Sequence, residues 1–148
     1  MRKAIDAFFR SAGYGVVGVS ADRRKFGNMV YRTMKEKGLT VYPVNPKLKE
    51  VEGSVCYPSV MDLPADVRSV VTVVPPDATI RIVADCMKRG ISTIWMQKGS
   101  DSPEAIKEAA NAGIAVVNGE CVMMFLEPVH SFHAFHRWVN KLVGAYPR

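Results

Sequence analysis

The sequence has few cysteines and no long apolar run. Its three cysteines, Cys56, Cys86 and Cys121, are far apart and form no C-x-x-C pair, which fits neither a disulfide framework nor a thiolate zinc site. The longest apolar runs are far shorter than the roughly 20 residues that cross a bilayer. The segment up to Phe9 is interrupted by Asp6 and is too short for the apolar core of a signal peptide. We therefore expect a cytoplasmic protein with reduced thiols and no membrane partner.

The length and composition indicate one globular domain. The chain has 148 residues, of which 48% are hydrophobic and 23% are charged, enough apolar material for a full core and too much for a disordered chain. Residues 1–50 carry 11 Lys and Arg against 4 Asp and Glu, a net charge of +7, whereas residues 51–148 carry 9 against 10. An anionic partner is therefore expected near the N-terminal elements.

Short β-branched runs alternate with helical patterns along the chain. The expected strands cover residues 14–19, 40–44, 69–74, 91–96 and 114–117. The expected helices cover residues 2–11, 29–37, 76–89 and 103–112, with a short helical turn over 57–63. This alternation predicts an α/β fold, a single doubly wound Rossmann-like domain with a five-stranded parallel sheet of order 3-2-1-4-5 and helices on both faces. The domain spans residues 1–148, with its core over about 11–121 and an extra C-terminal helix over about 128–143.

The first strand-to-helix loop has features of a phosphate site. In a doubly wound sheet the ligand lies outside the carboxyl ends of the strands where the strand order reverses, here between the first and fourth strands. Ser20 ends the first strand, Gly27 permits close backbone approach, and Asn28 is expected to cap a helix whose N–H groups attract anions. Three consecutive cations add positive charge: Arg23, Arg24 and Lys25. The alternative is an ordinary loop with solvated basic side chains.

The sequence favours a phosphorylated nucleotide over NAD(H). A G-x-G-x-x-G match occurs at residues 13–18, but it precedes and enters the expected strand instead of following it. An NAD site also needs an acidic residue at the end of the second strand, where this chain has Asn45, Pro46 and Lys47. Lys47 suits a ribose phosphate better than a free diol. An NAD(H)-binding redox-sensing or oxidoreductase-type module remains the alternative.

Four stretches carry a family resemblance: residues 16–20, 38–46, 53–59 and 94–99, together with the late Cys121. The most specific of them is Val-x-Pro-Val-Asn-Pro followed by Cys-Tyr-Pro-Ser. At these stretches the chain resembles the small stand-alone CoA-binding proteins, which are similar to the CoA-binding domain of the succinyl-CoA synthetase α subunit.

The resemblance implies a site for coenzyme A or an acyl-CoA. Gly18, Ser20 and the loop to Asn28 would hold the diphosphate, residues 45–47 would line the adenosine side, and Gln97 would border the pantetheine path. The full set of candidate cofactor-binding residues is Gly18, Val19, Ser20, Arg23, Lys25, Phe26, Gly27, Asn28, Val44, Asn45, Pro46, Lys47, Val74, Pro75 and Gln97. The synthetases also use a phosphorylated histidine from a second domain, so the resemblance carries over binding, in a sensing or presenting role, and no catalytic residue.

Other candidate sites are weaker. Glu127, His130, His133 and His136 recur every three residues, a spacing that spreads them around a helix, so no metal site is predicted. Cys121 is either a reactive thiol beside the cofactor or, as we favour, a small buried hydrophobe. No nucleic-acid-binding motif accompanies the basic residues, so a nucleic-acid partner is not expected. A homodimer and a partner enzyme both stay open.

Overall fold

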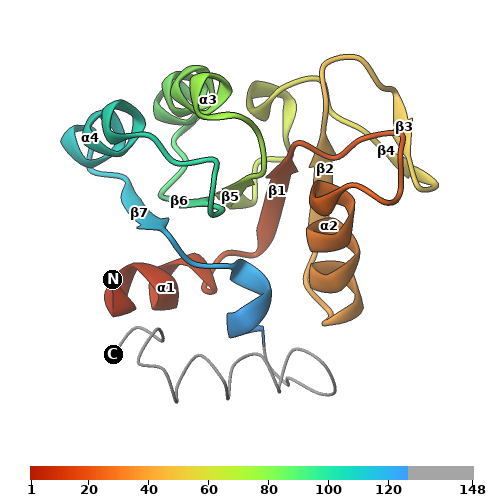
Figure 1. Ribbon diagram of the computed structural model, residues 1–148, viewed down its shortest axis with the longest axis horizontal. Helices are drawn as coiled ribbons and strands as arrows, with labels where there is room; N and C mark the ends of the chain where they lie inside the picture. The colour runs from red at the N-terminus through yellow and green to blue at the C-terminus, as the bar shows by residue number, and fades with distance from the viewer. Residues whose placement is uncertain (127–148) are drawn as a thin grey trace.

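The computed structural model describes residues 1–126. Its centre is a five-stranded parallel sheet (Figure 1). The sheet contains β1 (Gly13–Val17), β2 (Val41–Val44), β5 (Val67–Thr72), β6 (Thr93–Met96) and β7 (Ala115–Asn118). The helices are α1 (Arg2–Phe8), α2 (Phe26–Glu36), α3 (Pro76–Arg89) and α4 (Pro103–Asn111), with 3-10 turns η1 (Val60–Asp62) and η2 (Val122–Phe125). The predicted C-terminal helix and the histidine series with Glu127 lie outside the described residues.

Helices cover both faces of the sheet, which confirms the predicted fold class. Figure 1 shows α1, α2 and η2 on one face and α3 and α4 on the other. Successive side chains of β6 point to opposite faces of the sheet. The ring centroid of Trp95 lies 5.2 Å from that of Phe8 in α1, whereas Ile94 and Met96 belong to the core under α3 and α4. Ile94, Trp95 and Met96 are all fully buried. Because both faces of the sheet are covered, such a strand is a continuous apolar run and does not alternate apolar with polar residues.

The predicted strand order is wrong. The observed order is β2-β1-β5-β6-β7, that is 2-1-3-4-5 when the five parallel strands are counted along the chain. The third of them, β5, pairs with β1 and not with β2, with Thr72 opposite Val17. The strand order therefore reverses between β1 and β5, and the ligand crevice belongs there rather than between the first and fourth strands.

Proline explains why β2 lies at the edge. Pro43 stands in the middle of β2 and has no N–H to donate, which a sheet tolerates at its margin and not in a central strand. Beyond this margin the N–H of Tyr57 donates to the Pro43 carbonyl (2.9 Å), and the N–H of Asn45 donates to the Tyr57 carbonyl (3.0 Å). The segment around Tyr57 thus occupies the position that the predicted order gave to a full strand.

Two local features differ from the sequence prediction. Helix α2 begins at Phe26 with Lys25 as its N-cap, so Asn28 lies inside the first turn and does not cap the helix as predicted. A small hairpin of β3 (Glu50–Val51) and β4 (Ser54–Val55) was not predicted. Among residues 1–126, no helix has both the length and the apolar character that a bilayer crossing requires.

Candidate functional site

Three backbone segments meet at the end of β1. Gly18 follows β1 with a φ of +111°, a conformation that favours glycine, and its N–H donates to the Val44 carbonyl (3.3 Å). A Cβ on Gly18 would collide with the carbonyl of Val73, and a Cβ on Gly27 would collide with the carbonyl of Gly18. The end of β1, the end of β5 and the first turn of α2 are therefore in direct backbone contact, which only these two glycines permit.

The first turn of α2 presents backbone donors at this point. Among residues 1–126, no acceptor contacts the N–H groups of Phe26 and Gly27. Unpaired N–H groups and the positive end of the helix dipole together favour an anion. The Lys25 and Phe26 side chains are exposed beside them. The start of α2 is thus suited to a phosphate group.

Asn28 shapes the loop that precedes α2. Its side chain is fully buried. The Asn28 Oδ1 accepts from the N–H of Ser20 (2.8 Å), and the Asn28 Nδ2 donates to the Ser20 carbonyl (2.8 Å) and to Oε2 of Glu52 (2.9 Å). All of its hydrogen-bonding groups are directed at protein partners. The Asn28 side chain therefore fixes the position of the loop at Ser20.

Two of the three consecutive cations face carboxylates. Arg24 pairs with Asp22 through Nε at 3.0 Å, and Arg23 lies 3.4 Å from Oε1 of Glu52. Burial raises the pKa of Glu52, but hydrogen bonds from Asn28 and Arg32 and the charges of Arg32 and Arg23 outweigh it, so the pKa falls below its ordinary value. The positive charge available to a ligand in this loop is therefore smaller than the sequence indicates.

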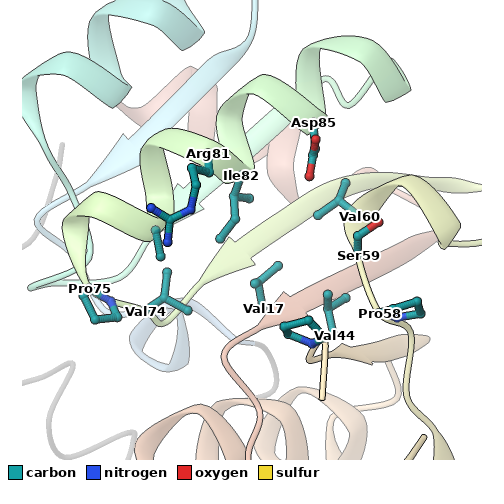
Figure 2. A pocket seen from close by; sticks show the side chains of 12 residues that line it. Val17, Val44, Pro58, Ser59, Val60, Val74, Pro75, Arg81, Ile82 and Asp85 are labelled. Atoms are coloured by element: carbon teal, nitrogen blue, oxygen red, sulfur yellow. The ribbon is translucent and has the colours of Figure 1, made fainter. Parts of the chain in front are cut away.

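An apolar cavity of about 480 Å³ lies beside this loop, between α3 and the carboxyl ends of β1 and β2. It is lined by Val17, Val44, Pro46, Pro58, Ser59, Val60, Val74, Pro75, Ala78, Arg81, Ile82 and Asp85. Figure 2 shows Val17, Val44 and Val74 pointing into it, with Arg81 and Asp85 reaching its margin from α3. Four predicted site residues, Val44, Pro46, Val74 and Pro75, therefore line one cavity at the point where the strand order reverses.

The predicted residues after β2 divide into two kinds. Asn45 positions backbone: its Nδ2 donates to the Val19 carbonyl (2.9 Å) and its Oδ1 accepts from the N–H of Lys47 (2.8 Å). Lys47 is exposed and lines a second hollow of about 430 Å³ together with Pro46, Leu48, Lys49, Cys56 and Pro58. This hollow adjoins the apolar cavity through Pro46 and Pro58, which line both.

Gln97 is buried and already has partners. Its Oε1 accepts from the N–H of Val122 (2.7 Å), and its Nε2 donates to Sγ of Cys121 (3.4 Å). It also lines a shallow hollow of about 330 Å³ with residues 73–75 and 98–100. Gln97 thus borders the hollow while its amide attaches the end of β6 to the start of η2.

The sequence analysis missed a buried hydroxyl group that joins two of these loops. Oγ of Ser100 donates to Oγ1 of Thr72 (3.0 Å), accepts from the N–H of Val74 (3.3 Å) and lies 2.9 Å from Oγ1 of Thr79. Both Ser100 and Thr79 are buried. The loop after β5 is therefore fixed to the loop after β6. Single hydroxyls in loops gave no pattern from which this contact could be predicted.

The family profile described as CoA binding domain matches residues 13–127. The chain belongs to this family. The match includes the whole sheet, both glycines of the β1 loop and every residue of the apolar cavity. The resemblance seen in the sequence is thereby confirmed, and so is coenzyme A as the cofactor of the family.

Known proteins of related sequence and structure agree with this membership. The α subunit of acetate–CoA ligase (ADP-forming) II from Pyrococcus furiosus is 30% identical over 129 residues, which is 80% of this chain and 28% of that protein. A hypothetical protein from Pyrococcus horikoshii is 35% identical with a TM-score of 0.77, covering 82% of this chain and 86% of that one. The acetyl-coenzyme A synthetase 1 of Ca. Korarchaeum cryptofilum is 30% identical with a TM-score of 0.63, covering 71% of this chain and 25% of that one. The chain thus spans about a quarter of the length of the α subunit from Pyrococcus furiosus and of the synthetase from Ca. Korarchaeum cryptofilum.

Proposed function

We propose that the chain binds coenzyme A or an acyl-CoA with the diphosphate at the start of α2. The observation that carries the proposal is the backbone contact between Gly18 and Gly27, which places the N–H groups of Phe26 and Gly27 at the carboxyl end of β1. A diphosphate needs backbone donors and close approach, and both are available at this point. The candidate residues Val19 and Ser20 lie in the same loop, held by Asn45 and Asn28 respectively.

The adenosine side fits the apolar cavity. Val44 and Pro46 follow β2, Val74 and Pro75 follow β5, and these two pairs line the cavity from different strands. A flat, largely apolar base suits such a wall, with Arg81 and Asp85 as the polar groups at its margin. Lys47 in the adjoining hollow is the cation for the ribose phosphate. The pantetheine arm would then run past Gln97 in the hollow after β6.

The proposed role of the bound cofactor is sensing, or presenting the thioester to a partner. The ligase relatives devote only part of their length to the region that matches this chain. Among residues 1–126, no group of His, Cys, Asp and Glu side chains forms a metal-ligating cluster. The chain therefore contributes recognition of the nucleotide, and the reaction, where there is one, is assigned to a partner.

An NAD(H)-binding module is the second candidate, and the end of β2 argues against it. NAD sites place an acidic side chain at this position to bind the ribose hydroxyls. Here Asn45 is committed to the Val19 carbonyl and to the N–H of Lys47, and the exposed side chain that follows is a lysine. The end of β2 therefore offers a cation to a ribose phosphate and no carboxylate to a free diol.

A direct titration distinguishes the two candidates. The purified chain is titrated with CoA, dephospho-CoA and NADH by isothermal calorimetry, and the nucleotide that co-purifies is identified by mass spectrometry. The proposal expects CoA to bind more tightly than dephospho-CoA and NADH to bind weakly. Lys107→Ala on α4, an exposed cation remote from the loops after β1 and β2, serves as the charge control and should bind CoA like the unaltered chain. Tight binding of NADH with no binding of CoA would contradict the proposal.

A further inference from the structure

The β3–β4 hairpin places a partly buried carboxylate against the diphosphate loop. Glu52 lies in the turn between the two strands, and its side chain is only 10% exposed. Its backbone φ of +48° is in the left-handed region, where a residue other than glycine is strained. Gly53 follows with a φ of +80°, so both turn residues have the positive φ that a two-residue hairpin requires. The chain keeps a carboxylate where a glycine or asparagine would fit the turn more easily.

Glu52 contacts two side chains of α2 that hold opposite ends of the loop before that helix. Asn28 donates to Oε2 of Glu52 (2.9 Å). It also accepts from the N–H of Ser20 and donates to the Ser20 carbonyl. Arg32 donates through Nη1 to both oxygens of Glu52 (3.0 and 3.1 Å) and through Nη2 to the carbonyl of Arg23 (3.0 Å). The loop from Ser20 to Arg23 is therefore held at its first and last residues by side chains that share one carboxylate.

We infer that Glu52 is a positioning residue for the nucleotide diphosphate: it orients Asn28 and Arg32 so that the loop stays clear of the N–H groups at the start of α2. The inference rests on the proposed function, since it concerns the same site. We expect no contact between Glu52 and the ligand. Its effect passes through Asn28 and Arg32, each of which fixes a backbone group of the loop, and through its ion pair with Arg23 (3.4 Å).

An effect of the Glu52 charge and an effect of its positioning role would change the affinity for CoA in opposite directions. A carboxylate close to an anion site weakens anion binding through simple electrostatics, so Glu52→Gln should tighten CoA binding if charge alone matters. A positioning residue gives the reverse, because glutamine replaces one carboxylate oxygen by an NH2 group. In the place of Oε2 this group opposes the donors of Asn28 and Arg32, and in the place of Oε1 it opposes those of Arg32 and Arg23. The sign of the change in affinity therefore separates the two roles.

The matched control is Glu50→Gln. Glu50 lies on β3 of the same hairpin and is exposed, so its substitution removes the same charge from the same element without touching Asn28 or Arg32. Calorimetric titration of CoA at one salt concentration should show roughly a ten-fold or larger loss of affinity for Glu52→Gln and less than about a two-fold change for Glu50→Gln. Glu52→Asp, which keeps the charge and shortens the reach, should fall between the unaltered chain and Glu52→Gln. Equal or tighter binding by Glu52→Gln overturns the inference.

Amide hydrogen exchange tests the same point without any ligand. In the free chain the N–H of Ser20, bonded to Asn28, should exchange much more slowly than the N–H of Ala21, and Glu52→Gln should accelerate Ser20 while Glu50→Gln leaves it unchanged. If the unaltered chain fails to bind CoA, the proposed function fails, and unchanged Ser20 exchange in Glu52→Gln separately overturns the positioning role. Should Glu52→Gln not fold, Glu52→Asp takes its place: faster exchange of Ser20 than in the unaltered chain supports the inference, and unchanged exchange contradicts it.

Discussion

The carbonyl oxygen of Gly18 occupies the space that a side chain on Gly27 would need. Gly18 immediately follows β1 and Gly27 lies in the first turn of α2, so this contact sets the distance between the strand and the helix. The sequence predicted Gly27 as a residue of close approach. The structure identifies what it approaches, which is protein backbone, with the helix N–H groups brought to the site as a result.

Gly27→Ala should therefore damage both the fold and the site. The added Cβ would collide with the Gly18 carbonyl. Backbone cannot change rotamer as a side chain can, so α2 must move outward. We expect a loss of about 1–3 kcal/mol in the free energy of unfolding, typical of overpacking, together with a large loss of CoA affinity. Urea unfolding and calorimetric titration measure the two effects.

The control for this substitution is Gly38→Ala. Gly38 has a φ of +90° with open space around its Cβ position, so alanine there strains the backbone without moving α2 against β1. This variant should lose stability and keep its affinity for CoA. A Gly27→Ala chain that binds CoA normally would show that the glycine contact does not set the geometry of the site.

Lys47→Ala should reduce the affinity for CoA more than that for dephospho-CoA. The lysine is exposed beside Pro46 and is placed for a ribose phosphate. We expect about a three- to ten-fold loss for CoA, in keeping with one exposed charged contact, and little change for dephospho-CoA. Competition titrations of both nucleotides provide the comparison, and equal losses for the two ligands refute the assignment of Lys47 to the ribose phosphate.

The carboxylate of Glu52 should make the free energy of unfolding depend on pH. Its pKa is lowered in the folded chain below the ordinary value of 4.5, so the unfolded chain binds the proton more readily. The stabilisation is therefore fully present above pH 4.5 and is lost as the pH falls through the lower folded pKa. In urea unfolding between pH 7 and pH 3, the stability difference between the unaltered chain and Glu52→Gln should be largest near neutrality and shrink in acid. A difference that grows toward pH 3 would contradict the contacts with Arg32 and Arg23.

The three thiols should differ in their reaction with an alkylating reagent. Cys86 is fully buried, and burial raises its pKa to about 12. Burial also raises the pKa of Cys56, whereas Cys121 is partly exposed. Iodoacetamide at pH 8 should therefore modify Cys121 first and leave Cys86 unmodified until the chain unfolds, as peptide mass spectrometry can establish. Early labelling of Cys86 would show that the core under α3 opens readily.

The five strands of the parallel sheet could be predicted from the sequence, but their order in the sheet was predicted wrongly. Runs of β-branched residues indicated all five strands because buried parallel strands are apolar on both faces. The order depended on Pro43, whose missing N–H is compatible with an edge strand only; this signal was present in the sequence and was not used. Strands of two residues, such as β3 and β4, are too short to give a periodic pattern, so the hairpin that carries Glu52 had no counterpart in the sequence analysis.

The candidate site shows the same limit. Glycines and cations of one loop are adjacent in the sequence, so their grouping near the end of β1 could be predicted. Asn28 and Glu52 are 24 residues apart, and their contact depends on where the hairpin docks. Asn28 was therefore interpreted as a helix cap, when its side chain in fact holds the backbone of Ser20. Long-range partners of polar side chains become visible only once the fold is known.

The hydroxyl of Ser100 couples the loop after β5 to the loop after β6. Because one oxygen atom bonds to Thr72, Thr79 and the backbone of Val74 at once, the peptide leading into α3 and the peptide leading into α4 cannot shift independently. The loop that carries Pro75 and the loop that carries Lys98 and Gly99 are therefore fixed to each other at one point. The side chain of Ser100 thereby couples the two ends of the crevice through a single oxygen atom.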